Sequence, residues 1–149
     1  MKRMCASAAL AFFLAAPISY AADPRLVDGV SGAPIAWSDW VAKRGPVAVL
    51  VWASWAPDAQ DSLKTSEALV AACKEADLHF AVLDVQETLE EGRSALYGVE
   101  FGWLHDRHGA LLKQYRVIEV PSLLLLAADG STLAKIEASP EAIRTWSAR

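Results

Sequence analysis

The sequence contains very little cysteine, because only Cys5 and Cys73 occur among its 149 residues. Cys5 lies in the leader described below, so residues 22–149 contain Cys73 alone and cannot form an internal disulfide. This excludes a small scaffold held together by disulfides. Basic clusters are also missing, and a formal net charge of −4 leaves no patch that could neutralise a run of phosphates. Nucleic acid is therefore not expected as a partner.

An apolar run of membrane-spanning length is also absent, but a shorter one lies near the start of the chain. Lys2 and Arg3 precede an apolar segment over residues 6–18, which falls short of the roughly 20 residues that span a bilayer. Residues 19–21 (SYA) have small side chains at the first and third positions, as signal peptidase prefers. We predict a signal peptide over residues 1–21, cleaved after Ala21, and a periplasmic or otherwise exported protein. An uncleaved membrane anchor is the alternative.

Residues 22–149 have the length of one domain with one core. Loss of Lys2 and Arg3 would change the net charge from −4 to −6. Apolar runs predict strands over residues 47–52, 78–83, 99–104, 122–126 and 133–136, and a hairpin formed by residues 26–30 and 33–37. Helices are predicted over residues 57–75, 89–97 and 110–115. A short helix through Lys43 is predicted with Ser38 as its N-cap, and a last helix with Ser139 as its N-cap and Pro140 at its first position. This order predicts an α/β fold with a mixed central sheet flanked by helices.

The predicted helix over residues 57–75 carries Cys73. Leu63, Ser66, Val70 and Cys73 follow one another at helical spacing, which places them on one face. We therefore predict a buried thiol that reacts slowly, since free cysteine packs as a small apolar residue. An intermolecular disulfide through Cys73 is the alternative.

Two segments resemble the thioredoxin family. Residues 49–59 (VLVWASWAPDA) are similar to its strand and active-site turn, and residues 115–125 (YRVIEVPSLLL) to the segment with the cis-proline. The strand and helix between Tyr97 and Tyr115, including Asp106 and Gly109, resemble the insertion of TlpA-type exported thioredoxins. The resemblance implies a thioredoxin-like domain over residues 22–149, with an N-terminal hairpin, this strand-helix insertion and a cis Val120–Pro121 bond.

The resemblance also shows what the active-site motif lacks. Family members use one cysteine as a thiolate nucleophile and a second to resolve the mixed disulfide. Those positions correspond to Ala56 and Ala59, so no catalytic residue is expected. Leu50 stands where thioredoxins carry a buried acid for proton transfer, and Lys64 where TlpA-type helices have a kinking proline, which implies a straighter helix here. The retained leader favours a natural sequence over deliberate replacement of both cysteines.

Peptide binding does not require the missing sulfur atoms. The resemblance implies that an extended peptide could pair with the former active-site face at Trp55, Pro57, Asp58, Val120 and Pro121. We predict a non-catalytic peptide- or protein-binding module without a cofactor. Two alternatives stay open: a component of a thiol-disulfide exchange pathway with residual or assisted activity, and strands and a proline bend that persist only because the fold needs them.

Two histidines have a spacing that metal sites sometimes use. His105 and His108 lie at a predicted strand-to-helix turn, but no thiolate accompanies them. We predict a solvated role for the pair and no metal site.

Overall fold

The computed structural model describes residues 22–149, so the predicted signal peptide over residues 1–21 lies outside the described residues. The strands are β1 (Arg25–Asp28), β2 (Pro34–Ala36), β3 (Val47–Trp52), β4 (His79–Val85), β5 (Trp103–Asp106), β6 (Ser122–Leu126) and β7 (Thr132–Ile136). The helices are α1 (Trp37–Arg44), α2 (Ala59–Lys64), α3 (Ser66–Glu75), α4 (Leu89–Ala95), α5 (Ala110–Tyr115) and α6 (Pro140–Ser147). None of the helices within residues 22–149 has the length and hydropathy needed to cross a membrane.

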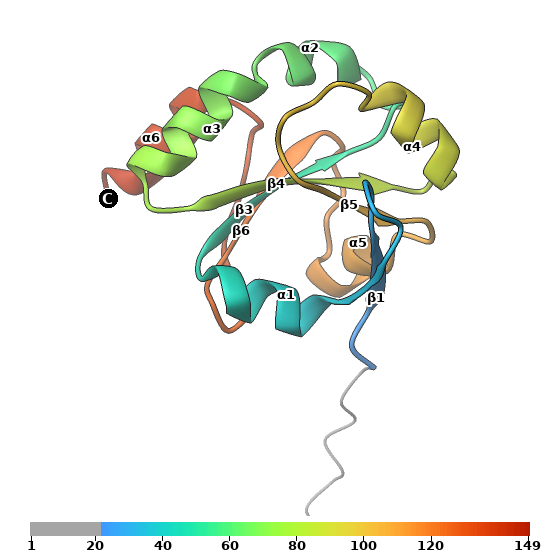
Figure 1. Ribbon diagram of the computed structural model, residues 1–149. Helices are drawn as coiled ribbons and strands as arrows, with labels where there is room; N and C mark the ends of the chain where they lie inside the picture. The colour runs from blue at the N-terminus through green and yellow to red at the C-terminus, as the bar shows by residue number, and fades with distance from the viewer. Residues whose placement is uncertain (1–21) are drawn as a thin grey trace, which may run out of the picture.

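The seven strands form one sheet in the order β2-β1-β5-β4-β3-β6-β7. Helices cover both faces: α1 and α5 lie on one side, and α2, α3, α4 and α6 on the other (Figure 1). β3 is buried along its whole length, between parallel β4 and antiparallel β6. A strand covered on both faces reads as an unbroken apolar run, which explains why β3 is so clear in the sequence. The predicted α/β fold with a mixed sheet between helices is confirmed.

The N-terminal hairpin joins the sheet through the inserted strand. β1 pairs with β2 and, on its other side, with β5, which in turn runs parallel to β4. The predicted strand over residues 99–104 starts too early, because β5 begins only at Trp103. Gly98 has a positive φ of 82°, and the segment that follows it does not pair with β4 until Gly102 accepts a hydrogen bond from Val82.

The predicted helix over residues 57–75 is wrong in one important respect, because it is divided into α2 and α3 at Thr65. The Thr65 hydroxyl donates to the Ser62 carbonyl at 3.0 Å and so competes for a helical acceptor. The straighter helix expected from Lys64 is therefore not present. The predicted apolar face is also wrong, since Val70 is exposed, while Cys73 packs on the buried side with Leu69 and Ala72.

The two predicted helix caps have different outcomes. Ser139 caps α6 by accepting from the Ala142 amide at 3.2 Å, with Pro140 in the first turn, as predicted. Ser38 does not cap α1, which starts one residue earlier, at Trp37. Instead the Ser38 amide and hydroxyl both donate to the Asp23 carboxylate, at 3.1 and 2.9 Å. The orphan N–H at this end is thus satisfied from the preceding segment.

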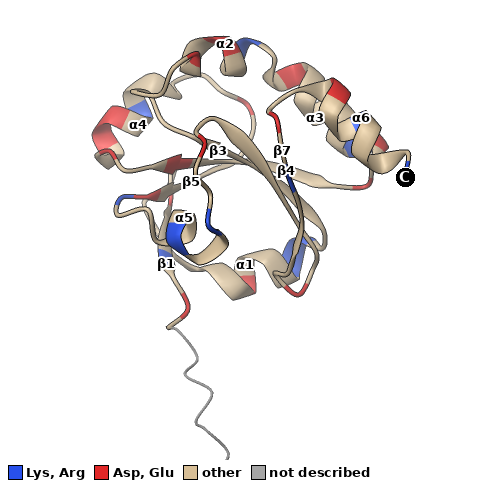
Figure 2. Cartoon of the chain, turned by 180° about the vertical axis from the view of Figure 1, so that it is seen from behind, with Lys and Arg blue, Asp and Glu red and all other residues tan. Residues whose placement is uncertain are grey.

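Charged residues lie mainly on the helices and on the turns at the ends of the strands (Figure 2). The central strands β3 and β6 contain none. In α1, Asp39 lies in the first turn, and Lys43 and Arg44 in the last, an arrangement that complements the helix dipole. α3 likewise ends with Lys74 in its last turn.

Candidate functional site

The active-site-like turn connects the end of β3 to the start of α2. The Ala56 amide donates to the Ala53 carbonyl at 3.1 Å, and the Ala59 amide to the Ala56 carbonyl at 3.3 Å. The buried Trp52 indole donates to the Ala59 carbonyl at 2.9 Å and fixes the first residue of α2 against the sheet. Asp58, with a positive φ of 57°, completes the turn without capping the helix through its side chain. The backbone of the turn is thus held by its own hydrogen bonds.

Ala56 and Ala59 lie inside this turn and are almost fully buried, with 7 % and 4 % of their surfaces exposed. Both belong to the main hydrophobic core. Methyl side chains offer no nucleophile and no group that could resolve a mixed disulfide. Leu50, on β3, is likewise a fully buried core residue without an ionisable group.

An apolar hollow lies beside the turn. Trp55 is 54 % exposed and Ile118 is 93 % exposed. Both line a hollow of about 440 Å³ whose other lining residues are Gln86, Leu112, Lys113, Val117 and Val120. The Val120–Pro121 peptide bond, at the end of the same loop, is cis. Large exposed apolar side chains around a concave surface are typical of interaction sites.

The structure brings together only some of the residues predicted to bind a peptide. Trp55 and Val120 line the same hollow. Pro57 and Asp58 are exposed on the turn, and Pro121 is half-buried next to Val120, but none of these three lines the hollow. Ile118 was not predicted as a binding residue, although a large apolar side chain in a loop between the charged residues Arg116 and Glu119 indicates an exposed apolar group.

A buried polar cluster that was not predicted from the sequence lies behind the turn. Asp84 and His105 face each other across β4 and β5, and the Asp84 carboxyl meets His105 Nδ1 at 2.8 Å. Both are buried, and Asp84 Oδ1 and His105 Nε2 have no hydrogen-bond partner in the described structure. Glu87 connects the cluster to the turn, because its carboxylate accepts from the Ser54 amide at 2.9 Å and from the Ser54 hydroxyl.

Burial controls the protonation of this cluster. It raises the pKa of Asp84 to about 9, with a further contribution from the neighbouring Glu87 carboxylate. Burial also lowers the pKa of His105. For Glu87, burial opposes ionisation, but the interactions with Asp84 and Ser54 outweigh it and lower the pKa. At neutral pH, Asp84 and His105 are therefore uncharged, and Glu87 carries the negative charge.

A buried acid thus exists near the turn, although not on the strand where the resemblance implied it. Asp84 lies opposite Trp52 in the pairing of β3 with β4. A single acid within the apolar run of β4 is the sequence signal that could have identified it, because an ionisable group is buried only where its surroundings provide a partner or keep it uncharged. Its location at the carboxyl ends of parallel strands is where α/β proteins commonly place functional groups.

The two histidines are not brought together. His105 is buried against Asp84, whereas His108 is exposed on the turn that follows β5. The expectation of a solvated role is therefore wrong for His105. Asp106 accepts from the Ala110 and Leu111 amides, at 3.0 and 2.9 Å, and so caps α5. Within residues 22–149, no group of three metal-ligating side chains is arranged to hold an ion.

Cys73 is buried, with none of its surface exposed, as predicted. Burial raises the pKa of its thiol to about 11. The nucleophilic thiolate is therefore scarce at neutral pH, and the sulfur lies in the core rather than at the former active-site face.

The order of the strands in the sheet, with parallel β4 and antiparallel β6 on either side of β3, and the helices on both faces are those of a thioredoxin-like fold. Similar solved structures include a Chlorobium tepidum protein assigned as the thiol:disulfide interchange protein DsbE, with 20 % identity and a TM-score of 0.67. That match covers 83 % of this chain and 89 % of the other. A secreted Mycobacterium tuberculosis disulfide oxidoreductase homologous to Escherichia coli DsbE matches with 18 % identity and a TM-score of 0.62, covering 85 % and 95 %.

A third similar structure is the exposed lipoprotein thioredoxin Etrx1 of Streptococcus pneumoniae, with 23 % identity and a TM-score of 0.62, covering 86 % of this chain and all of that one. No protein-family model matches the sequence, and no curated protein matches it. At these identities the similarity shows the thioredoxin-like fold, and the function has to be argued from the site.

Proposed function

We propose that this protein is an exported thioredoxin-like module that binds an extended peptide or an unfolded protein segment without thiol-disulfide exchange. The main support for the proposal is that one turn combines two inert, buried positions with an exposed aromatic side chain. Ala56 and Ala59 are buried and chemically inert, while the adjacent Trp55 is more than half exposed beside the loop that contains Val120.

The exposed apolar groups provide the binding energy in this proposal. Trp55 and Ile118 lose apolar surface to water when a ligand covers them, and burial of each side chain contributes on the order of 1.5–3 kcal/mol. Residues 117–120 lie outside any strand, and although the Val117 N–H donates to the Leu112 carbonyl, Ile118 and Val120 form no backbone–backbone hydrogen bond with the described residues and can therefore pair with an extended chain. Lys113 at the edge of the hollow favours segments with an acidic side chain.

Export is part of the proposal. It rests on the pattern of residues 2–21 and on the secreted or exposed proteins among the structural neighbours. The measurement that tests it is the N-terminal sequence of the protein recovered from its native host, which should begin at Ala22.

Binding can be tested with an array of immobilised thiol-free peptides. The parent protein should bind a subset of peptides with apolar and acidic residues. Trp55→Ala and Ile118→Ala should each weaken binding about tenfold, which corresponds to roughly 1.4 kcal/mol. Tyr97→Ala is the matched control, because Tyr97 is 91 % exposed but does not line the hollow. Equal binding by Trp55→Ala and the parent would refute the proposed site.

A role in thiol-disulfide exchange through Cys73 is not supported by the site. The thiol is inaccessible and has a raised pKa, so it cannot attack a partner's disulfide in the folded protein. Reduction of insulin by dithiothreitol distinguishes the two functions. A binding module leaves the rate at background, whereas residual or assisted activity raises it.

A further inference from the structure

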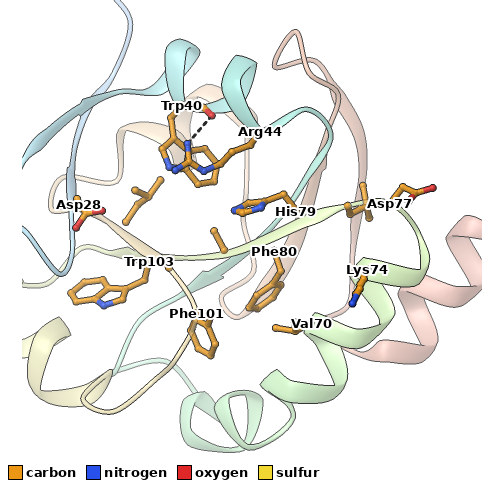
Figure 3. A pocket seen from close by; sticks show the side chains of 14 residues that line it. Asp28, Trp40, Arg44, Val70, Lys74, Asp77, His79, Phe80, Phe101 and Trp103 are labelled. Atoms are coloured by element: carbon orange, nitrogen blue, oxygen red, sulfur yellow. Dashed lines mark hydrogen bonds between the residues drawn. The ribbon is translucent and has the colours of Figure 1, made fainter.

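A second cavity lies away from the former active-site face, beside the first half of β4. It has a volume of about 620 Å³, within the range of small-molecule sites. Its apolar walls include four aromatic residues: Trp40, Phe80, Phe101 and Trp103. Trp40, Arg44 and His79 lie on one side of the β4 ribbon, and Phe80 and Phe101 on the other (Figure 3). The cavity therefore lies along the edge of the strand and has aromatic groups on both sides.

The cavity exists because β5 begins later than β4. The Val82 N–H donates to the Gly102 carbonyl, so the backbone groups of Val82 point to the edge of β4 that faces β5. Every second residue of a strand points its backbone groups to the same edge as Val82. Phe80 is such a residue, and no backbone bond joins it to residues 100–102. Its N–H is thus available at the edge that lines the cavity, and an oxygen atom of a ligand can accept from it.

Arg44 provides a fixed positive charge at the rim. Its guanidinium lies 4.3 Å from the centre of the Trp40 ring and donates to the Trp40 carbonyl at 3.3 Å. Among residues 22–149, neither Arg44 nor Lys74, the other lysine or arginine at this cavity, forms an ion pair. Stacking on Trp40 orients the planar guanidinium in advance, which reduces the entropy cost of binding a carboxylate.

Among the described residues, the acids at the cavity form no ion pair with these cations, although the Arg44 charge contributes to lowering the pKa of Asp28. The Asp28 carboxylate accepts from the Val30 amide and from the amide and hydroxyl of Ser31, at 2.7–3.0 Å. Asp77 lies at the far end of the cavity and points away from Arg44 (Figure 3). The cavity thus combines aromatic walls with two cations that form no ion pair with a described residue, so the guanidinium of Arg44 is free to pair with an anionic ligand.

We infer that this cavity binds a small organic anion with a flat aromatic body and one carboxylate. The aromatic body would lie against Phe80 and Phe101 at the open edge of β4, and the carboxylate would extend past that edge to pair with Arg44 on the other side of the strand. Lys74 adds attraction over a longer distance. This site is independent of the peptide-binding face, since Trp55, Ile118 and Val120 do not line it.

Calorimetric titration with three probes of similar size tests the inference. Indole-3-propionate should bind with a dissociation constant below about 1 mM. Indole-3-propionamide, which is neutral, and tryptamine, which is a cation, should bind at least about tenfold more weakly, because a charge-assisted pair to Arg44 is lost.

Variants localise the binding. Arg44→Gln should weaken indole-3-propionate binding at least about tenfold, because a charge-assisted pair is lost. Phe101→Ala should weaken it through lost stacking. Lys43→Gln is the matched control, since Lys43 is the neighbouring exposed cation on α1 and does not line the cavity. Because Arg44 is exposed, its replacement should leave the thermal midpoint close to that of the parent.

Three results would overturn the inference. These are no saturable binding of indole-3-propionate by the parent, equal affinity for the neutral amide, and unchanged affinity of the Arg44→Gln variant.

Discussion

At the residue scale, Cys73 shows how burial determines reactivity. In a chain with Cys5→Ser, Cys73 is the only thiol, and its pKa of about 11 leaves little thiolate at pH 8. We expect the folded protein to react with a disulfide reagent at least about a hundredfold more slowly than the protein unfolded in urea. Rates that differ by only a few-fold would show that the thiol is accessible.

Asp84 makes stability depend on pH in an unusual direction. Its folded pKa of about 9 lies far above the ordinary aspartate value of 3.8, so the folded state holds a proton that the unfolded state releases. Stability therefore falls as pH rises between these two values. Between pH 7 and 9, where His105 is neutral in both states, the free energy of unfolding should fall by about 1 kcal/mol per pH unit.

Urea unfolding at several pH values measures this slope. Asp84→Asn, which mimics the protonated acid, should remove most of it. Asp77→Asn should keep it, because Asp77 is exposed on the turn before β4. A parent protein whose stability is constant from pH 7 to 9 would show that Asp84 is ionised in the folded state.

Restoring two cysteines tests whether only the sulfur atoms are missing. Ala56→Cys/Ala59→Cys should reduce insulin above background, because the backbone of the turn is intact. The activity should be weak, since α2 begins only at Ala59 and is short, and the Glu87 carboxylate lies behind the turn and disfavours a thiolate. Ala56→Ser/Ala59→Ser is the control for size and polarity. A double cysteine variant that folds, forms its disulfide and remains inactive would indicate a remodelled site.

At the element scale, α4 packs against Asp84 only because residue 92 is a glycine. A Cβ atom there would lie 2.2 Å from Asp84 Oδ2, too close for any contact. Gly92→Ala should destabilise the protein by about 1–3 kcal/mol, despite the better helix propensity of alanine. Gly102→Ala is the control, because a Cβ atom at that position meets nothing within 4 Å. Thermal unfolding that gives equal midpoints for Gly92→Ala and the parent would contradict this packing.

The elements that could be predicted from the sequence are those with a local cause. β3 and β6 are continuous apolar runs, and α6 has its cap and proline in sequence. The break at Thr65 also has a local cause, a hydroxyl that bonds to the Ser62 carbonyl, but a threonine inside a helical pattern does not by itself predict a break. The cap of α1, in contrast, could not be predicted, because it comes from Asp23, in a segment before the hairpin. Contacts between residues that are far apart in the sequence cannot be predicted from the spacing of neighbouring residues.

At the scale of the whole molecule, the resemblance predicted the thioredoxin-like fold and located the turn at Ala56 and Ala59. It did not predict the cluster of Asp84, His105 and Glu87, because these residues come from separate segments and meet only when β4 and β5 pair. The same holds for the cavity at Arg44, which depends on where β5 begins. The fold therefore follows from patterns along the chain, whereas both sites depend on how distant segments pack.

The central claim is that the former active-site face binds extended chains without sulfur chemistry. The most direct test is a nuclear magnetic resonance titration of the protein with a reduced, alkylated, unfolded polypeptide that has no free thiol. We predict saturable shifts confined to the Trp55 indole and to the amides of residues 53–56, 58 and 117–120. Trp55→Ala should move the midpoint of the remaining shifts to an about tenfold higher polypeptide concentration, and Tyr97→Ala should leave it unchanged. No shifts at saturating polypeptide, or shifts confined to other surfaces, would contradict the account.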